Sequence, residues 1–407
     1  MSSLEIELRS RLEELRAQNL YRELREVDSA QGPRIRLGKS ELLNFSSNDY
    51  LGLANEPALR EAAIKAIERF GAGSGASRLI CGSLKPHHEL DEAIARFKGA
   101  EAALSFSSGY ATALGTICAL LSKDDVIIID KLVHASIVDA ARLCGAKLRV
   151  FAHNNLESLE AILQWANARQ SRHTTSATVN QPALRSRVLI VTESVFSMDG
   201  ELAPLRDIVE LKERHGAWLM VDEAHATGLF GEKRRGLAEA HEISESVDIQ
   251  MGTLGKAVGS AGGYICGSRV LIDYLVNRAR SLIFSTAPSP ASAAAAKAGI
   301  EFIESKEGDL RRDLLWARVD DLKNSMVGGK WKVPVVRSPI IPVMVGDETA
   351  ATDLAAGLRA RGIFIPAIRY PTVARGQARL RLTVTAAHKR EEVEGVAAEL
   401  QEIGETT

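Results

Sequence analysis

The sequence lacks the patterns of secreted, membrane-spanning and disulfide-bonded proteins. No uninterrupted apolar run reaches the roughly 18 to 20 residues that would span a bilayer, and the first eight residues, Met-Ser-Ser-Leu-Glu-Ile-Glu-Leu, carry charges where a signal peptide needs an apolar run. The four cysteines lie far apart without a CxxC pair, which argues against a disulfide framework or a zinc knuckle and favours buried thiols. They are Cys81, Cys118, Cys144 and Cys266. These absences predict a cytoplasmic protein.

An excess of charge of one sign is also missing. Lys and Arg number 51 and Asp and Glu 52, which gives a formal net charge of −1. A global electrostatic case for binding nucleic acid is therefore absent, although a local basic patch remains open. Hydrophobic residues make up 45% and charged residues 25%, a balance typical of folded globular proteins. With 407 residues, the chain exceeds one ordinary domain, which favours a large core domain with smaller attachments.

Continuous apolar runs alternate with helical patterns along the middle of the chain. Such runs, separated by helices, are typical of a mostly parallel sheet covered on both faces. The predicted strands occupy residues 126–129, 148–151, 188–191 and 218–221. A helix is expected over residues 89–97, and the polar stretch 170–187 is expected to be an exposed loop.

The two ends of the chain depart from this alternation of strands and helices. We expect a charged helix over residues 4–25 and a short strand over 42–45. After residue 290 the composition becomes Ala-rich and then charged, and two further strands, 340–345 and 380–385, bracket another helix. The sequence therefore predicts an α/β fold in three parts. These are an N-terminal helix and arm (1–55), a large domain with a mostly parallel sheet (56–289) and a smaller C-terminal α+β domain (290–407).

The most reactive candidate residue is a lysine in a segment of small residues. Lys256 ends Gly252-Thr-Leu-Gly-Lys256 and is followed by Ala-Val-Gly-Ser-Ala-Gly-Gly. Little bulk surrounds it, so a flat ring could lie against the backbone there, and a desolvated amine can become an imine-forming nucleophile. The segment lacks the spacing of a phosphate-binding P-loop. The alternative is a solvated lysine in a flexible loop.

A second candidate follows the apolar strand 218–221. Asp222 ends this strand, and His225 comes three residues later. Ligands of α/β sheets bind beyond the carboxyl ends of strands, so an acid there could hold a proton on a heterocyclic nitrogen or bind a metal. The sequence shows no further cluster of metal ligands, which weakens the metal interpretation. His225 alone could be an ordinary polar residue.

Two more features resemble parts of a cofactor site. Ser105-Phe-Ser-Ser-Gly-Tyr110 precedes an apolar helical pattern, and small residues that open a helix expose backbone N–H groups to an anion. A plain serine cap of the helix is the alternative. His134, after the strand 126–129, could stack on an aromatic ligand or be structural.

The order of these features is more informative than each one alone. A phosphate cradle, a stacking histidine, a strand-end aspartate and a reactive lysine together match what pyridoxal 5′-phosphate needs. The carboxylate would keep the ring nitrogen protonated, because a negative neighbour favours the cationic form. We therefore predict that pyridoxal phosphate is the cofactor and that no metal is needed.

The chain resembles the α-oxoamine synthase family of pyridoxal phosphate enzymes from about Leu20 onwards. The motifs that carry the resemblance are Phe45-Ser-Ser-Asn-Asp-Tyr-Leu-Gly-Leu53, Gly73-Ser-Gly-Ala-Ser-Arg-Leu79, Ser194-Val-Phe-Ser-Met-Asp-Gly200, Val221-Asp-Glu-Ala-His-Ala-Thr-Gly228, Gly252-Thr-Leu-Gly-Lys256 and Arg379-Leu-Arg-Leu-Thr-Val-Thr-Ala-Ala-His388. The resemblance implies the fold-type I architecture of pyridoxal phosphate-dependent transferases, which are homodimers with active sites at the subunit interface.

The resemblance also implies roles for individual residues. Lys256 would form the Schiff base with the cofactor, and Asp222 would pair with its ring nitrogen. The other implied cofactor contacts are His134 on the ring face, His225 and Ser197 at the phenolic oxygen, the amides of Gly109 and Tyr110 with the Thr253 hydroxyl at the phosphate, and Thr286 from the partner subunit. The implied substrate contacts are Asn48 and Arg381 at the amino-acid carboxylate, together with Arg22, Thr372 and His134.

Within this family, the loop Pro366-Ala-Ile-Arg-Tyr-Pro-Thr-Val373 is most similar to the branch that makes 8-amino-7-oxononanoate for biotin biosynthesis. The implied reaction condenses L-alanine with pimeloyl-CoA or pimeloyl-acyl carrier protein and releases carbon dioxide. Tyr370 and Ala113 depart from the usual pattern, as does Pro288-Ser-Pro290. The alternatives are a family member that uses glycine or serine, an aminotransferase, or a non-catalytic cofactor-binding protein.

Overall fold

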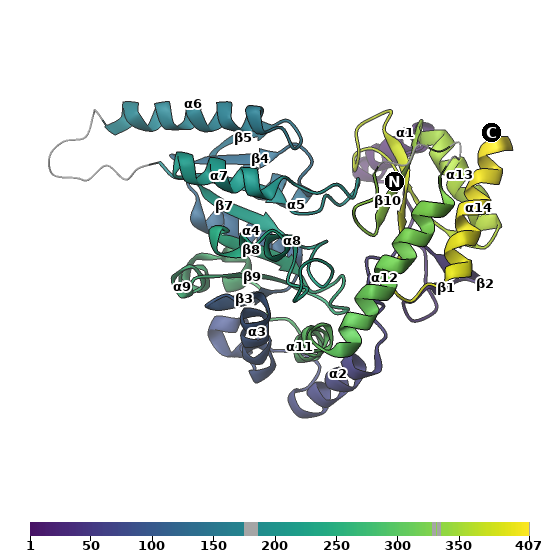
Figure 1. Ribbon diagram of the computed structural model, residues 1–407, viewed down its shortest axis with the longest axis horizontal. Coiled ribbons are helices and arrows are strands. Elements are labelled where there is room, and N and C mark those ends of the chain that lie inside the picture. Colours follow the sequence, from purple (N-terminus) through teal and green to yellow (C-terminus); the bar gives the residue numbers. More distant parts are fainter. Residues whose placement is uncertain (175–185, 328–330, 332–334, 407) are drawn as a thin grey trace. The chain divides into compact units, whose positions relative to one another are not determined.

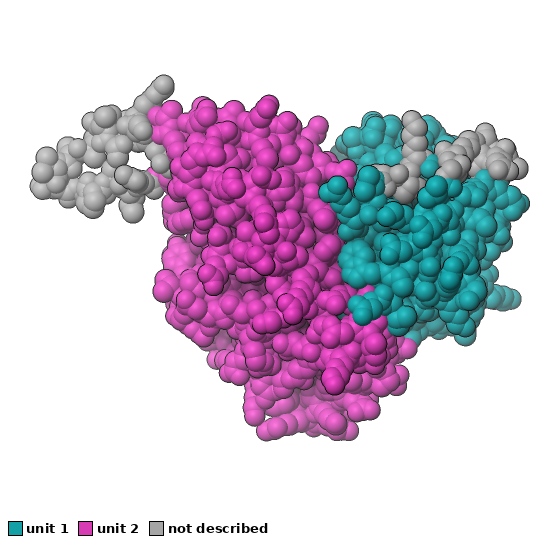
Figure 2. Space-filling model, viewed as in Figure 1, with its two compact units in different colours: residues 1–52, 198–200, 313–407 teal, residues 53–197, 201–312 magenta. Residues whose placement is uncertain are grey.

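The computed structural model describes residues 1–174, 186–327, 331 and 335–406, and these residues form two compact units (Figure 2). Unit 1 comprises residues 1–52, 198–200 and 313–407, and unit 2 comprises residues 53–197 and 201–312. That a unit is compact does not show that it folds on its own. The division at residues 55 and 289 therefore stays a prediction.

Unit 2 is built around a seven-stranded sheet (Figure 1). In spatial order its strands are β3 (Ala102–Phe106), β9 (Gly263–Gly267), β8 (Ile249–Thr253), β7 (Trp218–Asp222), β6 (Val188–Glu193), β4 (Val126–Asp130) and β5 (Lys147–Phe151). The strands from β8 to β5 are parallel to their neighbours, and only β9 runs antiparallel within this sheet. The predicted α/β class with a mostly parallel sheet is confirmed.

The central strands are apolar on both faces, because both faces are covered. Ile127 and Ile129 of β4 belong to one cluster with α4, α5 and α9, while Val126 and Ile128 point to the opposite face, as alternation along a strand requires. All four are at most 2% exposed. Full burial of each such side chain stabilises the fold by about 1.5–3 kcal/mol, so the apolar runs specify the position of the sheet.

The helices of unit 2 precede, connect and follow the strands of its sheet. They are α2 (Pro57–Phe70), α3 (Lys85–Lys98), α4 (Gly109–Leu120), α5 (Ala135–Leu143), α6 (Leu156–Thr174), α7 (Leu205–His215), α8 (Leu237–Ala240), α9 (Arg269–Arg278), α10 (Arg280–Ile283) and α11 (Pro290–Glu304), with short turns η1 (Arg78–Gly82) and η2 (Ser244–Ser246). The helix predicted over 89–97 is confirmed as part of α3. The prediction of a loop over 170–187 is wrong for residues 170–174, because α6 buries Leu159, Leu163 and Ala166 and continues to Thr174. Residues 175–185 lie outside the described residues.

Unit 1 contains two three-stranded sheets. One comprises β1 (Arg34–Leu37), β2 (Ser40–Asn44) and β11 (Ile363–Phe364), and the other comprises β10 (Ile340–Gly346), β13 (Ala378–Thr383) and β12 (Ala367–Ile368). Its helices are α1 (Ser3–Ala17), α13 (Glu348–Ala360), α14 (Arg390–Thr406) and the part of α12 (Lys306–Ser325) from residue 313 onwards. The strands predicted over 42–45, 340–345 and 380–385 correspond to β2, β10 and β13.

The first helix is shorter than predicted. It ends at Ala17 rather than at residue 25, and Asn19 adopts a φ of 53°. Asn tolerates this left-handed conformation better than most residues, and it stops the helix here. The backbone N–H groups of Leu20 and Tyr21 both donate to the Leu15 carbonyl. The chain from residue 18 to residue 27 therefore continues as a non-helical arm.

The four cysteines are free thiols, but their burial differs. Cys266 is buried and Cys118 and Cys144 are half-buried, whereas Cys81 is exposed. The prediction of a buried thiol is wrong for Cys81, because it lies in the exposed turn η1. Among the helices in the described parts of the chain, none combines the length and the apolar character that crossing a membrane requires.

Candidate active site

The carboxyl edge of the unit 2 sheet carries two buried acids side by side. Strands β6 and β7 end in Glu193 and Asp222, which are direct partners in the register of the sheet. Both residues are at most 5% exposed. The backbone N–H of Ala224 donates to Asp222 Oδ1 at 2.9 Å. Asp222 therefore lies where α/β sheets bind ligands.

Lys256 and His225 meet at this edge. Lys256 follows β8, and its Nζ lies 2.8 Å from His225 Nε2. His225 is buried and Lys256 is half-buried. Burial raises the pKa of Asp222 above its ordinary value, and the positive charge of Lys256 acts in the opposite direction. The structure therefore brings the three predicted residues into one electrostatic cluster.

His134 belongs to the same cluster. It caps the N-terminus of α5, where Ser136 N donates to its Nδ1 at 3.3 Å. Although the residue is solvent-exposed, the protein atoms that crowd its ring lower its pKa, and the charge of Lys256 lowers the pKa further. Asp222 acts in the opposite direction. His134 thus lies close enough to Asp222 and Lys256 to interact electrostatically with both. Its lowered pKa favours the neutral imidazole.

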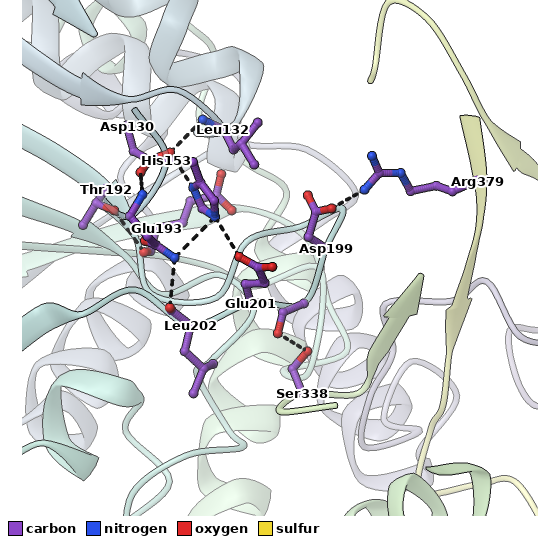
Figure 3. Close-up of polar contacts among 12 residues, drawn as sticks. Asp130, Leu132, His153, Thr192, Glu193, Asp199, Glu201, Leu202, Ser338 and Arg379 are labelled. Atoms are coloured by element: carbon purple, nitrogen blue, oxygen red, sulfur yellow. Dashed lines mark hydrogen bonds and ion pairs between the residues drawn. The ribbon is translucent and has the colours of Figure 1, made fainter. Parts of the chain in front are cut away.

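A hydrogen-bonded network supports the loop that precedes His134 (Figure 3). Asp130, at the end of β4, accepts from the backbone N–H of Leu132 at 2.7 Å and contacts His153 Nδ1 at 2.9 Å. The other ring nitrogen of His153 lies 3.0 Å from Glu201 Oε2. Burial alone would lower the pKa of His153, but the two carboxylates raise it above its ordinary value. The network therefore fixes where the chain leaves β4 toward His134.

The start of α4 carries the residues that were predicted to contact the phosphate. Ser108 caps the helix and accepts from Ala111 N at 3.1 Å, and this cap leaves the predicted anion site untested. The amides of Gly109 and Tyr110 come first in the helix and have no acceptor within it. Thr253 Oγ1 is adjacent, since a Cβ atom built on Gly109 would lie 3.8 Å from it. Two backbone N–H groups and one hydroxyl therefore gather at the positive end of a helix dipole.

Gly263 of β9 makes this arrangement possible. A Cβ atom at this position would lie 2.5 Å from Thr112 Oγ1 and 2.9 Å from the backbone N of Gly109. Both distances are shorter than a van der Waals contact, so a larger residue would push the start of α4 away from the sheet. Glycine is required here for close approach of two backbones.

These groups fit pyridoxal phosphate. A half-buried lysine amine, a carboxylate at a strand end, an imidazole beside both and an anion site at a helix N-terminus are the groups that this cofactor needs. Within the described ranges, no group of three or more His, Cys, Asp or Glu side chains could hold a metal ion.

Glu193 is a member of the site that the sequence analysis missed. Its carboxylate accepts hydrogen bonds from the backbone N–H groups of His134 and Ser197, while its Oε1 atom has no hydrogen-bond partner among the described residues. Burial raises the pKa of Glu193 to about 8, and the neighbouring Asp222 contributes to the rise. Glu193 therefore connects two predicted cofactor contacts. Its position at the end of an apolar strand was the available signal, but the sequence does not show that this strand lies beside the one that ends in Asp222.

A buried ion pair anchors the segment after Asp222. Lys98 Nζ of α3 lies 2.5 Å from Glu223 Oε2, and both side chains are at most 1% exposed. Glu223 Oε1 also accepts from the backbone N–H of Ala238 at 2.8 Å. The sequence analysis missed this pair, because nothing in the sequence matches Lys98 to Glu223 across 125 residues.

The other predicted residue of unit 2, Thr286, is exposed, and it directly precedes Ala287, whose backbone N–H donates to the Ala76 carbonyl at 3.0 Å. Its contact with a partner subunit stays a prediction.

Unit 1 carries four of the five predicted substrate-binding residues, while the fifth, His134, lies in unit 2. Arg22 Nη2 lies 3.4 Å from Thr372 Oγ1, so the structure brings these two residues together. Arg381 is buried on β13, where its guanidinium donates to Thr383 Oγ1 at 3.0 Å. Asn48 Oδ1 accepts from the Tyr50 hydroxyl at 3.4 Å.

A second arginine of β13 is held by an ion pair. Arg379, on the same face of the strand as Arg381, pairs with Asp199 (Figure 3). Near this pair, the Ser338 hydroxyl donates to the Gly200 carbonyl at 3.0 Å. The pair fixes the strand that presents Arg381.

Comparison with known proteins identifies the family. The family model of aminotransferase class I and II matches residues 40–400. The chain belongs to this family. An 8-amino-7-oxononanoate synthase of Anaeromyxobacter sp. is 46% identical over 389 residues, 96% of this chain and 93% of the relative. That of Geotalea daltonii is 45% identical over 394 residues, 97% of this chain and 96% of the relative. The predicted resemblance is therefore confirmed.

Solved structures agree with the assigned fold. A serine palmitoyltransferase from S. paucimobilis, solved with pyridoxal phosphate and myriocin bound, has a TM-score of 0.89 and 26% identity, and it covers 100% of this chain and 99% of that one. The 8-amino-7-oxononanoate synthase from Francisella tularensis has a TM-score of 0.74 and 26% identity, over 90% of this chain and 98% of that one. The fold-type I architecture predicted from the motifs is confirmed.

Proposed function

We propose that the protein condenses L-alanine with a pimeloyl thioester, with loss of carbon dioxide, to give 8-amino-7-oxononanoate for biotin biosynthesis. The observation that carries this proposal is the cluster of Lys256, His225 and Asp222 at the carboxyl edge of the sheet. The 8-amino-7-oxononanoate synthases that are 41–46% identical over nearly the full chain support the choice of substrates. The protein is an acyltransferase that uses pyridoxal 5′-phosphate.

Residues of unit 2 would hold the cofactor. When bound, pyridoxal phosphate supplies an aldehyde that reacts with amines and a ring that withdraws electrons from the carbon beside the amino group. The amides of Gly109 and Tyr110 and the Thr253 hydroxyl would bind its phosphate. His134 would lie on the ring face, and His225 and Ser197 would contact the phenolic oxygen.

Asp222 and Lys256 would carry out the acid–base catalysis. A charged Asp222 would favour a proton on the nitrogen of the bound cofactor ring, because Coulombic attraction stabilises the protonated form. The Lys256 amine removes the α-proton of alanine, a role that requires a neutral amine within hydrogen-bond reach of that proton. The His225 ring, 2.8 Å from Nζ, orients the amine and exchanges a proton with it.

Residues of unit 1 would bind the substrates. Arg381 and Asn48 would bind the alanine carboxylate, a task that suits the planar fork of arginine. Arg22 and Thr372, which lie side by side, would contact the acyl substrate.

We also propose that the enzyme is a cytoplasmic homodimer in which Thr286 contacts the phosphate at the partner subunit's site. The resemblance to the α-oxoamine synthases supports this assembly. Sedimentation at concentrations that span the assay range would test it, and a fully active monomer would contradict it.

One assay tests the function. Purified protein is incubated with L-alanine and either pimeloyl-CoA or pimeloyl-acyl carrier protein, and thiol release and product mass are recorded. Formation of 8-amino-7-oxononanoate with one thiol per product is expected. Replacing alanine by glycine or serine separates other α-oxoamine synthases. An aminotransferase would release neither thiol nor carbon dioxide.

A further inference from the structure

His153, which the proposed mechanism does not use, lies between two segments that carry proposed cofactor contacts (Figure 3). Its Nδ1 lies 2.9 Å from Asp130 Oδ1 at the end of β4, and its Nε2 lies 3.0 Å from Glu201 Oε2. Asp130 precedes the loop that leads to His134, and Glu201 follows Ser197 by four residues. The imidazole therefore connects the approach to one cofactor contact with the segment that carries another.

The segment 194–203 folds back on itself beside this ring. The backbone N–H of Phe196 donates to the Glu201 carbonyl at 2.9 Å. The Phe196 ring meets the His153 ring edge to face, with the ring centres 4.3 Å apart and an angle of 89° between the planes. Ser197, the next residue, is buried. The imidazole therefore supports this segment through Phe196 before Ser197 and through Glu201 after it.

The two short contacts of the ring require two N–H donors. A neutral imidazole has one donor and one acceptor, whereas a carboxylate only accepts. A neutral His153 that donates to Asp130 would turn its Nε2 lone pair toward the Glu201 oxygen at 3.0 Å. These two carboxylates are the charged groups that face the ring, and both raise the pKa of His153 against the effect of burial. The Asn154 amide, 3.3 Å from Nε2, and the Phe196 ring are uncharged neighbours.

We propose that His153 is a positioning residue, which holds Ser197 at the phenolic oxygen of the bound cofactor by joining Asp130 to Glu201. This rests on the contact that the proposed function assigns to Ser197. A hydrogen bond to that oxygen favours its charged form, and so it affects both the affinity for the cofactor and the visible absorbance. When the imidazole loses its second proton, one of the two links is lost and the segment 194–203 is held less firmly.

A double-mutant cycle tests whether His153 acts through Ser197. The visible spectrum and the dissociation constant of pyridoxal phosphate are measured for His153→Gln, for Ser197→Ala and for the double variant. Gln keeps a side-chain donor but carries no charge. His215→Gln is the matched control, since it changes another half-buried histidine of unit 2, at the end of α7 and before β7, at the opposite edge of the sheet.

We expect each single variant to bind the cofactor about tenfold more weakly, the equivalent of one hydrogen bond, and to shift the absorbance in the same direction. The double variant should bind no more weakly than the weaker single variant, because both changes remove the same contact. The control variant keeps the wild-type spectrum and affinity. Additive losses in the double variant would overturn the proposal, as would a wild-type spectrum and affinity in His153→Gln.

The charge of the ring is measured separately in the apoprotein by nitrogen NMR with labelled histidine. At pH 6.5, where an ordinary histidine is half protonated, more than half of His153 should carry both protons. Glu201→Gln, at an exposed position, keeps an acceptor but removes a charge, so His153 should lose its second proton at a lower pH. The absorbance of the bound cofactor should change with this titration and move with it in Glu201→Gln. A mostly neutral ring at pH 6.5, or an absorbance change that Glu201→Gln does not move, would overturn the proposal. Turnover of the wild type with alanine and a pimeloyl thioester tests the proposed function independently.

Discussion

Replacing Glu193 by Gln tests whether a neutral carboxylic acid stands beside Asp222. Burial and the neighbouring Asp222 raise the pKa of Glu193 to about 8, whereas an ordinary glutamate titrates at 4.5. Gln keeps the shape of the protonated acid, and its carbonyl can still accept from the amides of His134 and Ser197. The variant therefore removes the titration of the group and keeps its hydrogen bonds.

The sign of the effect follows from proton linkage. Between pH 4.5 and about 8, the unfolded chain has lost this proton and the native apoprotein retains it. The unfolded state binds fewer protons there, so the free energy of unfolding falls as the pH rises. From pH 5.5 to 7.5 the loss is at most about 3 kcal/mol, at roughly 1.4 kcal/mol per pH unit. In Glu193→Gln, this fall in the free energy of unfolding should be absent. Asp222, whose pKa is also raised, is still present in the variant, so part of the pH dependence of stability remains.

Two measurements on the apoprotein check this prediction. Urea unfolding at pH 5.5 and 7.5 should show a smaller decrease in the stability of Glu193→Gln than in that of the wild type. Infrared difference spectra between the two proteins should contain a protonated carboxyl band at pH 6.5 that disappears as the pH rises through about 8. Glu210→Gln, at an exposed position of α7, controls for the loss of one carboxylate. Equal pH dependence of the wild type and Glu193→Gln, with no such band, would refute the reasoning.

Three further substitutions have defined outcomes. Lys256→Ala should abolish the visible absorbance of the bound cofactor and the turnover. Borohydride treatment of this variant should leave the peptide around residue 256 at its unmodified mass. Full activity would contradict the assignment. Asp222→Asn should retain cofactor but slow the exchange of the alanine α-proton into deuterated water by orders of magnitude, and an unchanged exchange rate would count against its role. Lys98→Met should lower the free energy of unfolding by about 3–5 kcal/mol, because it leaves Glu223 charged and buried without its cation. Denaturant titration measures this loss, and a change below about 1 kcal/mol would contradict the role of this ion pair in stability.

The sequence predicted the parts that depend on local pattern. Apolar runs such as 126–129 marked the central strands, and the residues that follow such runs marked the carboxyl edge where Asp222 lies. It did not reveal Glu193 or the pairing of Lys98 with Glu223. Both depend on which strands and helices become neighbours, and sheet order is not encoded by local periodicity. The end of the first helix was missed for a different reason, because one Asn in a left-handed conformation overrides a helical pattern that continues beyond it.

The glycine at position 263 has a consequence for how this enzyme can change. It contributes no group to the chemistry, and yet even one methyl group there would collide with the helix whose first amides are proposed to receive the phosphate. In a library of random variants, this position should tolerate substitution as poorly as Lys256 does. Its variants should be recognised by weak retention of cofactor rather than by an altered choice of amino acid.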